Sequence, residues 1–373
     1  MASIKRQTSG RWKARYRDAA GKEHASHFGR KVDAQRWLDE STAALVTGQF
    51  VDPRAGTVPF RDYAEQWRAM QVHRDTSRAH VETMLRRHAY PTFGSRPLAS
   101  ILPSEVQAWV TRLGTGGQGR KPLAPGTIGV VHSIVSGVMK AAVRDRRIGA
   151  NPCEGTKLPG VERKRVVPPT TEQVQAVRGA MPPELAALIT FAAGTGMRQG
   201  ECLGLTLDRI DFLRRTVEVD RQLVTLPGRA PYLAPPTTAA SVRTIPLPQV
   251  VVDALATHLQ DRTVARDGLV FTIDGDPITR QAFGHLWRPV VKAAGLPLGT
   301  GFHALRHYFA SLLIRHGESV KTVQARLGHA SAVETLDTYS HRWPDSDDRT
   351  REAVDSVLGN LAVNLRSNEA SKP

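Results

Sequence analysis

Apolar and charged side chains alternate at the start of the chain. In residues 11–17, RWKARYR, every second position is cationic: Arg11, Lys13, Arg15 and Arg17. Successive side chains of a β-strand point to opposite faces, so this pattern predicts a half-buried strand with a cationic outer face. A second short strand, KEHASHF, follows a turn at Gly21. The helix predicted to cover this sheet has an apolar side formed by Ala34, Trp37, Leu38 and Leu45.

Helical periodicity dominates residues 59–155, after a linker at residues 54–58 (RAGTV). The first helix has its apolar side at Phe60, Tyr63, Ala64 and Trp67. A second helix is predicted to begin near Thr76 and Ser77. A third has a capping box from Ser104 to Gln107 and ends at Gly114, and a fourth runs from Pro125 to about Arg146. These helices predict a compact all-α domain.

Residues 170–373 mix both periodicities. Capped helices are predicted from Thr171 and from Pro183 to Gly194. The β segments TVEVDRQLV and VRTIPLP follow, and helices resume near Pro248, interrupted by a short apolar strand at LVF (269–271). The chain is therefore expected to be multidomain: a small β-sheet with one helix (1–53), an all-α domain (59–155), and an α+β, mainly helical domain (170–373).

The charge balance favours a polyanionic partner. Lys and Arg total 51 among the 373 residues against 35 Asp and Glu, which gives a net charge of +16 and an isoelectric point near 10.4. Nucleic acid is the leading candidate, and the cations of residues 11–17, with no acid between them, favour contact with phosphates. The alternative for such a charge pattern is an ordinary solvated strand face.

Targeting and cysteine signals are weak. The start MASIKRQTSGRWKARYRD lacks an apolar signal core, and no later stretch is expected to approach the roughly 20 apolar residues of a membrane span. A cytosolic protein without a membrane partner is expected. Cys153 and Cys202 lie far apart without CxxC spacing, so neither a disulfide framework nor a metal site is predicted.

A helix predicted to begin near His303 carries the first candidate chemistry. Its buried stripe is expected to consist of Leu305, Tyr308, Phe309, Leu312 and Leu313. His303 and Arg306 lie off that stripe and share a face, so an imidazole and a guanidinium can converge on one small anion, such as a phosphodiester. His307 is interpreted as a supporting or solvent-facing side chain. An exposed polar helix end is the alternative for the whole segment.

Tyr339 is the candidate nucleophile. It follows His329 by ten residues, on a short helix that Val333 and Leu336 are expected to anchor. A phenol has a pKa of about 10, so nearby cations or a base must assist its deprotonation before it attacks phosphorus. Two Arg residues (Arg198 and Arg306) and two His residues (His303 and His329) are expected to supply the positive charge. Each alone could be an ordinary structural residue, and only the combination favours catalysis.

The order of these residues resembles the tyrosine recombinase (phage integrase) family. The matching segments are TGMRQGECLGL from Thr195, HALRHYFASLL from His303 and LGHASAVETLDTYSH from Leu327. By that resemblance, the groups around the scissile phosphate are Arg198, His303, Arg306 and His329, with Glu201 in support. Tyr339 would form a 3′-phosphotyrosine link. Because that link stores the bond energy, no ATP, metal or other cofactor is expected.

One position departs from the family pattern. Many relatives place a Lys in a β-hairpin, in a pattern like PKTxxSxRTIPL, as general acid for the 5′ oxygen. The matching segment here is PPTTAASVRTIPL, which has Thr237 at that position. A Thr cannot donate a proton as an ammonium does, so the acid is another group, with His303 and Arg229 as candidates, or the chain is a slowed or altered form.

The resemblance also covers the rest of the chain. It implies a three-stranded arm-type DNA-binding domain at residues 1–53, as in lambda-type integrases, a helical core-binding domain at 59–155 and a catalytic domain at 170–373. The implied activity is site-specific cutting and rejoining of double-stranded DNA at core and arm sites, through a Holliday junction, to integrate or excise a mobile element. The resemblance also implies that the protein forms a homotetramer on DNA in a prokaryotic cytoplasm. DNA-bending or directionality proteins are possible partners.

Three questions stay open at the level of sequence. The apolar stripe of the C-terminal tail could pack on a neighbouring subunit, which is favoured, or on its own subunit; it consists of Val354, Val357, Leu358, Leu361 and Val363. The missing Lys supports a regulatory DNA-binding protein with weak catalysis. A topoisomerase would use the same chemistry but has no need of an arm-binding domain.

Overall fold

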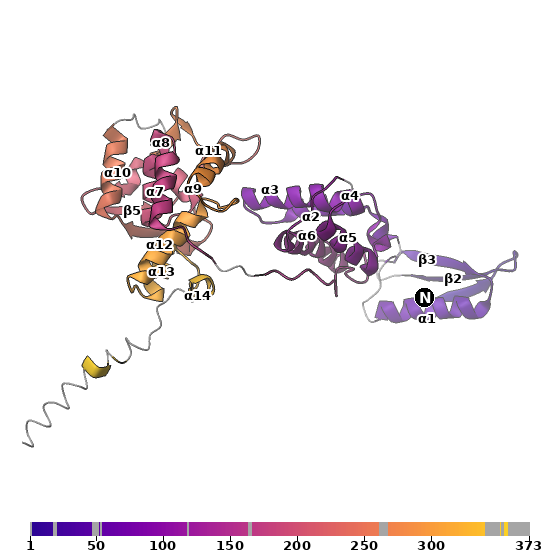
Figure 1. The fold of residues 1–373 in the computed structure, drawn as a ribbon. Coiled ribbons are helices and arrows are strands. Elements are labelled where there is room, and N and C mark those ends of the chain that lie inside the picture. Colours follow the sequence, from indigo (N-terminus) through magenta and orange to yellow (C-terminus); the bar gives the residue numbers. More distant parts are fainter. Residues whose placement is uncertain are drawn as a thin grey trace, which may run out of the picture. The chain divides into compact units, whose positions relative to one another are not determined.

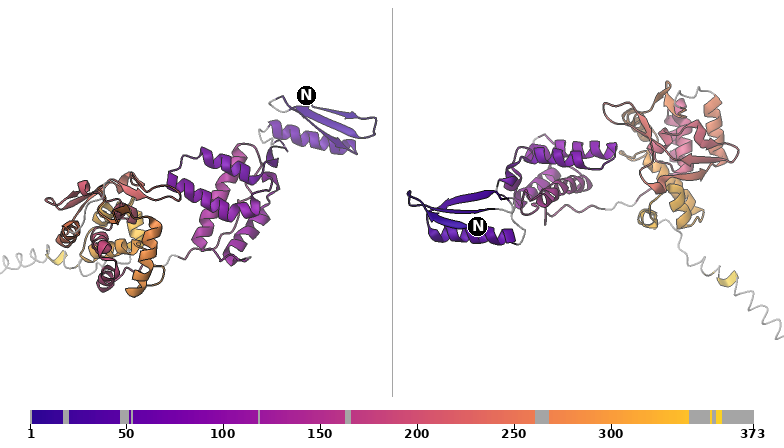
Figure 2. Two further views of the ribbon diagram at one scale, coloured as in Figure 1. Left: turned by 90° about the horizontal axis from the view of Figure 1, so that it is seen from above. Right: turned by 180° about the vertical axis from the view of Figure 1, so that it is seen from behind.

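The computed structural model describes residues 2–17, 21–46, 52, 54–117, 119–162, 166–260, 268–339, 351 and 354–356. The chain forms two compact units, residues 1–163 and 164–373 (Figures 1 and 2). The finer division of the first unit into domains 1–53 and 59–155 stays a prediction.

The first unit opens with an antiparallel sheet in the order β1–β2–β3, with α1 along one face (Figures 1 and 2). These elements are β1 (Ser3–Arg6), β2 (Trp12–Arg17), β3 (Glu23–Phe28) and α1 (Lys31–Val46). Strand β2 alternates as predicted, since Ala14 and Tyr16 are buried whereas Arg15 and Arg17 are exposed. The sheet and its helix are confirmed. Periodicity missed β1, because its sequence SIKR is too short and polar to show alternation.

The rest of the first unit is helical, as predicted. Its elements are α2 (Phe60–Met70), α3 (Asp75–Met84), a π-helical turn (Leu85–Ala89), α4 (Tyr90–Phe93), α5 (Pro103–Thr115) and α6 (Pro125–Arg144). Phe93 packs edge-on against both Phe60 and Trp109 in its core. The predicted position of the α5 capping box is wrong: Pro103 occupies the first turn, and the Glu105 carboxylate accepts from the Leu102 backbone N–H at 2.9 Å.

Helix α6 contradicts the expectation that no stretch of the chain approaches the length and apolar composition of a membrane span. It is 20 residues long with a mean hydropathy of 1.4 over its most apolar window, so by length and composition it alone among the described helices could cross a membrane. Its apolar side chains, such as Val131, Val135 and Val138, are buried in the core of the helical bundle. A buried core helix explains this composition.

The second unit is α+β and mainly helical, which confirms the predicted class. Its helices are α7 (Thr171–Ala180), α8 (Pro183–Thr195), α9 (Gln199–Leu203), α10 (Gln249–Gln260), α11 (Arg280–Ala293), α12 (His303–Arg315), α13 (Val320–Leu327) and α14 (Ala332–Tyr339). Its strands are β4 (Ile210–Asp211), β5 (Thr216–Val219), β6 (Gln222–Val224), β7 (Tyr232–Ala234), β8 (Arg243–Pro246), β9 (Thr272–Ile273) and β10 (Asp276–Pro277). They form a sheet in the order β4–β5–β8 and the hairpins β6–β7 and β9–β10.

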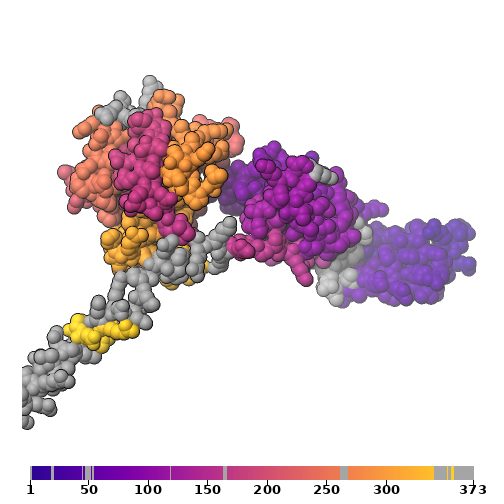
Figure 3. Space-filling view, viewed as in Figure 1, coloured from indigo at the N-terminus to yellow at the C-terminus, as the bar shows by residue number. Residues whose placement is uncertain are grey.

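Helix α8 is the centre of this unit. It is apolar on nearly all sides, and α7, α10 and α12 pack against it. Helices α12, α13 and α14 gather at one end of the unit, where the space-filling view shows them as one gold block (Figures 1 and 3). The strand expected at LVF lies slightly later: Leu269 makes only an isolated bridge to Thr206, and strand β9 begins at Thr272.

Candidate active site

A left-handed turn at the end of α8 places the first cation. Gly196 has a φ of +64°, and a Cβ there would lie 2.4 Å from the ring of Phe309 on α12. Only glycine meets both conditions without a shift of its neighbours. The chain then enters α9 with Arg198 as its N-cap residue, so the turn sets Arg198 beside α12.

Glu201 holds two guanidinium groups in place. Its carboxylate accepts from the Arg198 backbone N–H at 2.9 Å and from Arg198 Nη1 at 3.0 Å, and Arg243 Nη2 donates to it at 2.9 Å. Burial raises the pKa of this carboxyl, but the charge and hydrogen bond of Arg243, followed by Arg198, outweigh burial and hold the pKa below its ordinary value. Glu201 is therefore ionised at neutral pH and fixes both cations. Sequence reasoning missed Arg243, although it lies in the RTIPL segment.

Arg306 is the most deeply buried cation among the described residues. Only 2% of it is exposed, and its Nη1 donates to the Gly196 carbonyl at 2.9 Å. Its Nε and Nη2 are buried without a hydrogen-bond partner. Burial, and next the charge of Arg198, lower the pKa of Arg306 to about 10, so it stays charged at neutral pH. The expectation that Arg306 lies off the buried side of α12 was wrong.

His329 follows a second left-handed glycine. Gly328 ends α13 with a φ of +64°, and its carbonyl accepts from Arg198 Nη2 at 3.4 Å. The His329 ring is buried, with Nδ1 2.8 Å from Thr335 Oγ1 and Nε2 3.6 Å from the Glu334 carboxylate. Burial and then the charge of Arg306 lower the pKa of His329 to about 3.

Tyr339 lies beside His307, which the sequence indicated only as a supporting or solvent-facing side chain. The Tyr339 side chain is 1% exposed, and its hydroxyl lies 2.6 Å from His307 Nδ1. Burial raises the pKa of this phenol to about 12, although the charge of Arg306 acts in the opposite direction. His303 packs edge-on against the His307 ring, with 4.7 Å between ring centres.

The histidines do not contribute positive charge. Desolvation lowers the pKa of both His303 and His307 to about 4, with further lowering by neighbouring charge, and His329 titrates lower still. All three are neutral at pH 7. The positive field that was expected from two Arg and two His residues therefore comes from arginines.

Helix α14 is anchored differently from the expectation. Val333 is 62% exposed and Leu336 is 41% exposed, so neither anchors it. The buried residues are Thr335 and Tyr339, four apart on one face. Each lies at hydrogen-bond distance from a histidine, and Tyr339 also belongs to the buried apolar cluster that contains Phe309 and Leu327.

The segment that would carry the family Lys lies next to the cluster. Thr237 is exposed after β7, and Thr238 Oγ1 lies 2.9 Å from Ser241 Oγ. Ser241 Oγ in turn accepts from Arg198 Nη1 at 3.4 Å. Arg229, the other candidate acid, places its guanidinium over the Tyr232 ring at 5.5 Å.

The N-terminal cations lie on a surface. Arg15 and Arg17 are exposed on β2 and both approach the Glu23 carboxylate on β3, at 3.7 and 3.8 Å. Strand pairing also sets Lys5 opposite Lys13. Arg11 is exposed just before the strand. A role in DNA binding stays a prediction for this face.

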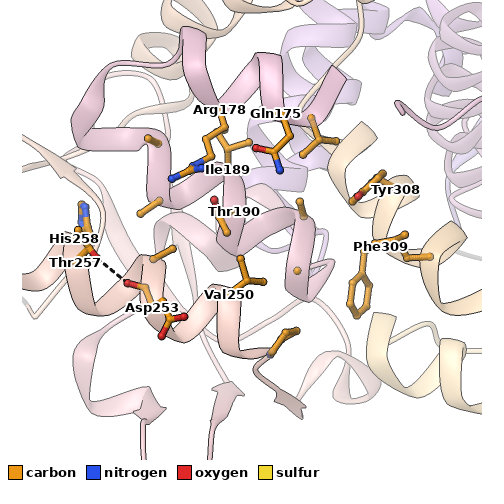
Figure 4. A pocket seen from close by; sticks show the side chains of 18 of the residues that line it. Gln175, Arg178, Ile189, Thr190, Val250, Asp253, Thr257, His258, Tyr308 and Phe309 are labelled. Carbon is orange, nitrogen blue, oxygen red and sulfur yellow. Dashed lines mark hydrogen bonds between the residues drawn. The ribbon is translucent and has the colours of Figure 1, made fainter. Parts of the chain in front are cut away.

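A cavity of about 730 Å³ opens between α7, α8, α10 and α12. Its walls include Ile189, Val250 and Phe309, with Gln175 and Arg178 at one side (Figure 4). Thr257 donates to the Asp253 carbonyl at 3.0 Å in the same wall. The cavity is thus apolar with polar edges.

Known proteins are similar to this chain in sequence and in fold. Residues 170–345 match the phage integrase family, and residues 2–47 match the phage integrase N-terminal domain. A putative prophage phiRv2 integrase of Mycobacterium tuberculosis is 30% identical, with 97% of this chain and 96% of that protein covered. The integrase of Mycobacterium phage L5 is 25% identical over 96% of this chain and 97% of its own length.

Solved structures agree. The Tn1549 transposon integrase in complex with transposon right-end DNA is 25% identical with a TM-score of 0.68, and 81% of this chain and all of that chain are covered. A lambda integrase dimer bound to a core site shares the fold at 17% identity, with a TM-score of 0.59 over 92% and 96% of the two chains. The chain belongs to the phage integrase family of tyrosine recombinases. It is a DNA recombinase that acts in site-specific recombination.

Proposed function

We propose that this recombinase cuts double-stranded DNA with Tyr339, holds the 3′ end as a phosphotyrosine and rejoins it to a new partner through a Holliday junction, so that a mobile element is integrated or excised. The observation that carries this proposal is Arg306, a buried charged guanidinium with two donors unsatisfied. Buried donors without partners are costly, and a phosphodiester oxygen would satisfy them.

The residues divide the work. Arg198 and Arg306 bind the nonbridging oxygens and stabilise the negative charge of the transition state. Tyr339 attacks phosphorus, and the bond to the 5′ oxygen breaks. His303 and His329 are hydrogen-bond donors to the same phosphate, while Glu201 positions Arg198. Since the phosphotyrosine keeps the bond energy, rejoining needs no ATP.

The proton for the 5′ oxygen has no Lys to supply it at position 237. His303 is the better placed donor, because it lies near enough to Arg306 and Arg198 for their charges to lower its pKa, whereas the Arg229 guanidinium lies over the Tyr232 ring. A bound phosphate would raise the pKa of His303 toward neutrality. The second candidate function, a regulatory DNA-binding protein with weak catalysis, is favoured only by Thr237.

The remaining parts have proposed roles on DNA. Residues 1–53 bind arm sites through Arg11, Lys13, Arg15 and Arg17. Residues 59–155 bind the core site, and residues 170–373 catalyse strand cleavage and rejoining. A homotetramer is assembled by the C-terminal tail, and the cavity between α8 and α12 is the apolar receptor that a neighbouring tail needs. Of that tail's apolar stripe only Val354 lies among the described residues, and it is exposed. DNA-bending or directionality proteins stay a prediction.

The test is a covalent adduct. Wild-type protein is incubated with candidate attachment DNA, and a protein–DNA complex that resists denaturation is expected on a gel. Tyr339→Phe should give none while it binds the same DNA with nearly unchanged affinity. Binding without any adduct by the wild-type chain would favour the regulatory function. Relaxation of DNA without partner exchange would favour a topoisomerase.

A further inference from the structure

His307 is the side chain at hydrogen-bond distance from the candidate nucleophile. Its Nδ1 lies 2.6 Å from Tyr339 Oη, and the two rings meet at 64° with centres 5.7 Å apart. This geometry lets a phenol donate its proton to an imidazole nitrogen.

We propose that His307 accepts the proton of Tyr339 as the tyrosine attacks the DNA, and returns it when the strand is rejoined. In cleavage, the Oη–H bond breaks, its proton passes to His307 Nδ1, and Oη forms a bond to phosphorus. The 5′ oxygen leaves with the electrons of its bond to phosphorus and takes a proton from the general acid or from solvent water. Rejoining reverses each transfer. The inference rests on the proposed function.

Other nearby groups are unsuited to this proton. His329 Nδ1 lies at hydrogen-bond distance from Thr335, and no hydrogen bond joins His329 to Tyr339 among the described contacts. Arg306 has no acceptor atom. His303 packs edge-on against His307, and no hydrogen bond joins it to Tyr339 among the described contacts. His307 is thus the acceptor that already lies at the right atom.

The surroundings tie this transfer to DNA binding. The groups that act on the pair are Arg306 and His303 from α12 and Glu334 from α14. Beside the unsatisfied Arg306 guanidinium, a proton on His307 is unfavourable, and the phenol therefore stays protonated. A phosphodiester on Arg306 would bring negative charge next to His307 and make its protonated form easier to reach. The nucleophile is activated where the substrate is bound.

The packing of α14 supports the pairing. Thr335 and Tyr339 are the buried residues of that helix, and each contacts one histidine. His307 therefore also positions Tyr339, and the experiment must separate positioning from proton transfer. Asn can place a hydrogen-bonding oxygen near the position of Nδ1, but it takes no proton at neutral pH. Leu can neither accept a hydrogen bond nor take a proton.

The first experiment measures adduct formation on a suicide attachment substrate by wild type, His307→Asn and His307→Leu. Both variants are expected to be slower by about 10²-fold, the lower range for removal of a general base. His316→Leu, at the exposed end of the same helix, is the matched control and should cut at the wild-type rate. Wild-type rates in His307→Leu, or full rescue by Asn, would overturn the proposal, the latter because positioning would suffice.

The second experiment removes the tyrosine from the reaction. In a Tyr339→Phe background, a 5′-hydroxyl strand attacks DNA ending in a 3′-(4-nitrophenyl) phosphate, and nitrophenolate leaves without needing a proton. Adding His307→Leu should change this rate less than about twofold, because His307 acts on the Tyr339 proton alone. A slowing as large as in the first experiment would assign His307 to folding or phosphate binding and overturn the inference. Absence of any wild-type adduct would instead refute the proposed function.

Discussion

The cations of β2 and those around Arg306 show two different uses of positive charge. Arg15 and Arg17 are exposed, share one acid and can follow a phosphate backbone. Arg198, Arg243 and Arg306 are held by Glu201 or by the Gly196 carbonyl. Exposed charge supplies affinity that salt weakens, whereas fixed charge can stabilise a transition state. The comparison predicts that mutations in the two regions change different measured quantities.

The largest effect is expected at the fixed cations. Arg306→Ala, or Arg198→Ala, should slow DNA cleavage by about 10² or more, because in the proposed mechanism each donates to charge that develops in the transition state. DNA affinity at moderate salt should change by only a few fold, as measured by filter binding beside adduct kinetics. A variant that cuts within a few fold of wild type would remove that Arg from the site.

A gain of rate is expected at Thr237. Thr237→Lys should accelerate cleavage by about tenfold or more, since a positioned general acid contributes about 10² to 10⁴ in rate. In a substrate with a 5′-bridging sulfur, the 5′-thiolate leaves without protonation. The wild-type and Thr237→Lys forms of the protein should therefore cut that substrate equally well. If neither rate changes, another group already donates the proton, and His303 and Arg229 are the next positions to test.

The exposed cations should affect binding alone. Replacing Arg11, Lys13, Arg15 and Arg17 together with Ala should weaken arm-site binding and flatten its dependence on salt, by up to about 0.9 in log–log slope for each phosphate that the variant no longer neutralises. Cleavage of a suicide core substrate should stay unchanged. Deleting residues 1–53 should have the same effect. Unchanged arm affinity in the quadruple variant would refute the role of this strand.

The last expected effect is on stability and leaves the chemistry aside. Gly196→Ala should lower the free energy of unfolding by about 1 to 3 kcal/mol, because alanine is strained at positive φ and its Cβ would meet Phe309. Gly228, also at positive φ but with nothing within 4 Å, is the matched control. Its alanine variant should be destabilised less, as measured by urea unfolding. Equal destabilisation would mean that the approach to Phe309 contributes nothing.

Sequence periodicity predicted the main elements but not their contacts. Alternation found β2 and helical spacing found α2 and α12, since both patterns report one buried face. The prediction for α14 is wrong in its anchors, because Val333 and Leu336 are exposed whereas Thr335 and Tyr339 are buried, with His329 and His307 at hydrogen-bond distance. No local pattern encodes such pairs.

The site was predicted as a set of residues and less well as an electrostatic environment. The family-like order singled out Arg198 and Arg306, but the pairing of Arg243 with Glu201 and of His307 with Tyr339 depends on tertiary packing. Burial likewise decides that the histidines are neutral, which spacing along the chain cannot reveal. The sequence thus indicated the candidate groups, and the fold indicates their charge.

The most direct test of the account is to locate the DNA on the protein. The denaturation-resistant adduct is digested with protease and nuclease, and the peptide that keeps a nucleotide is identified by mass spectrometry. We predict a 3′-phosphodiester on Tyr339, and no such peptide from Tyr339→Phe. A nucleotide on any other residue, or recombination by the Tyr339→Phe chain, would contradict it.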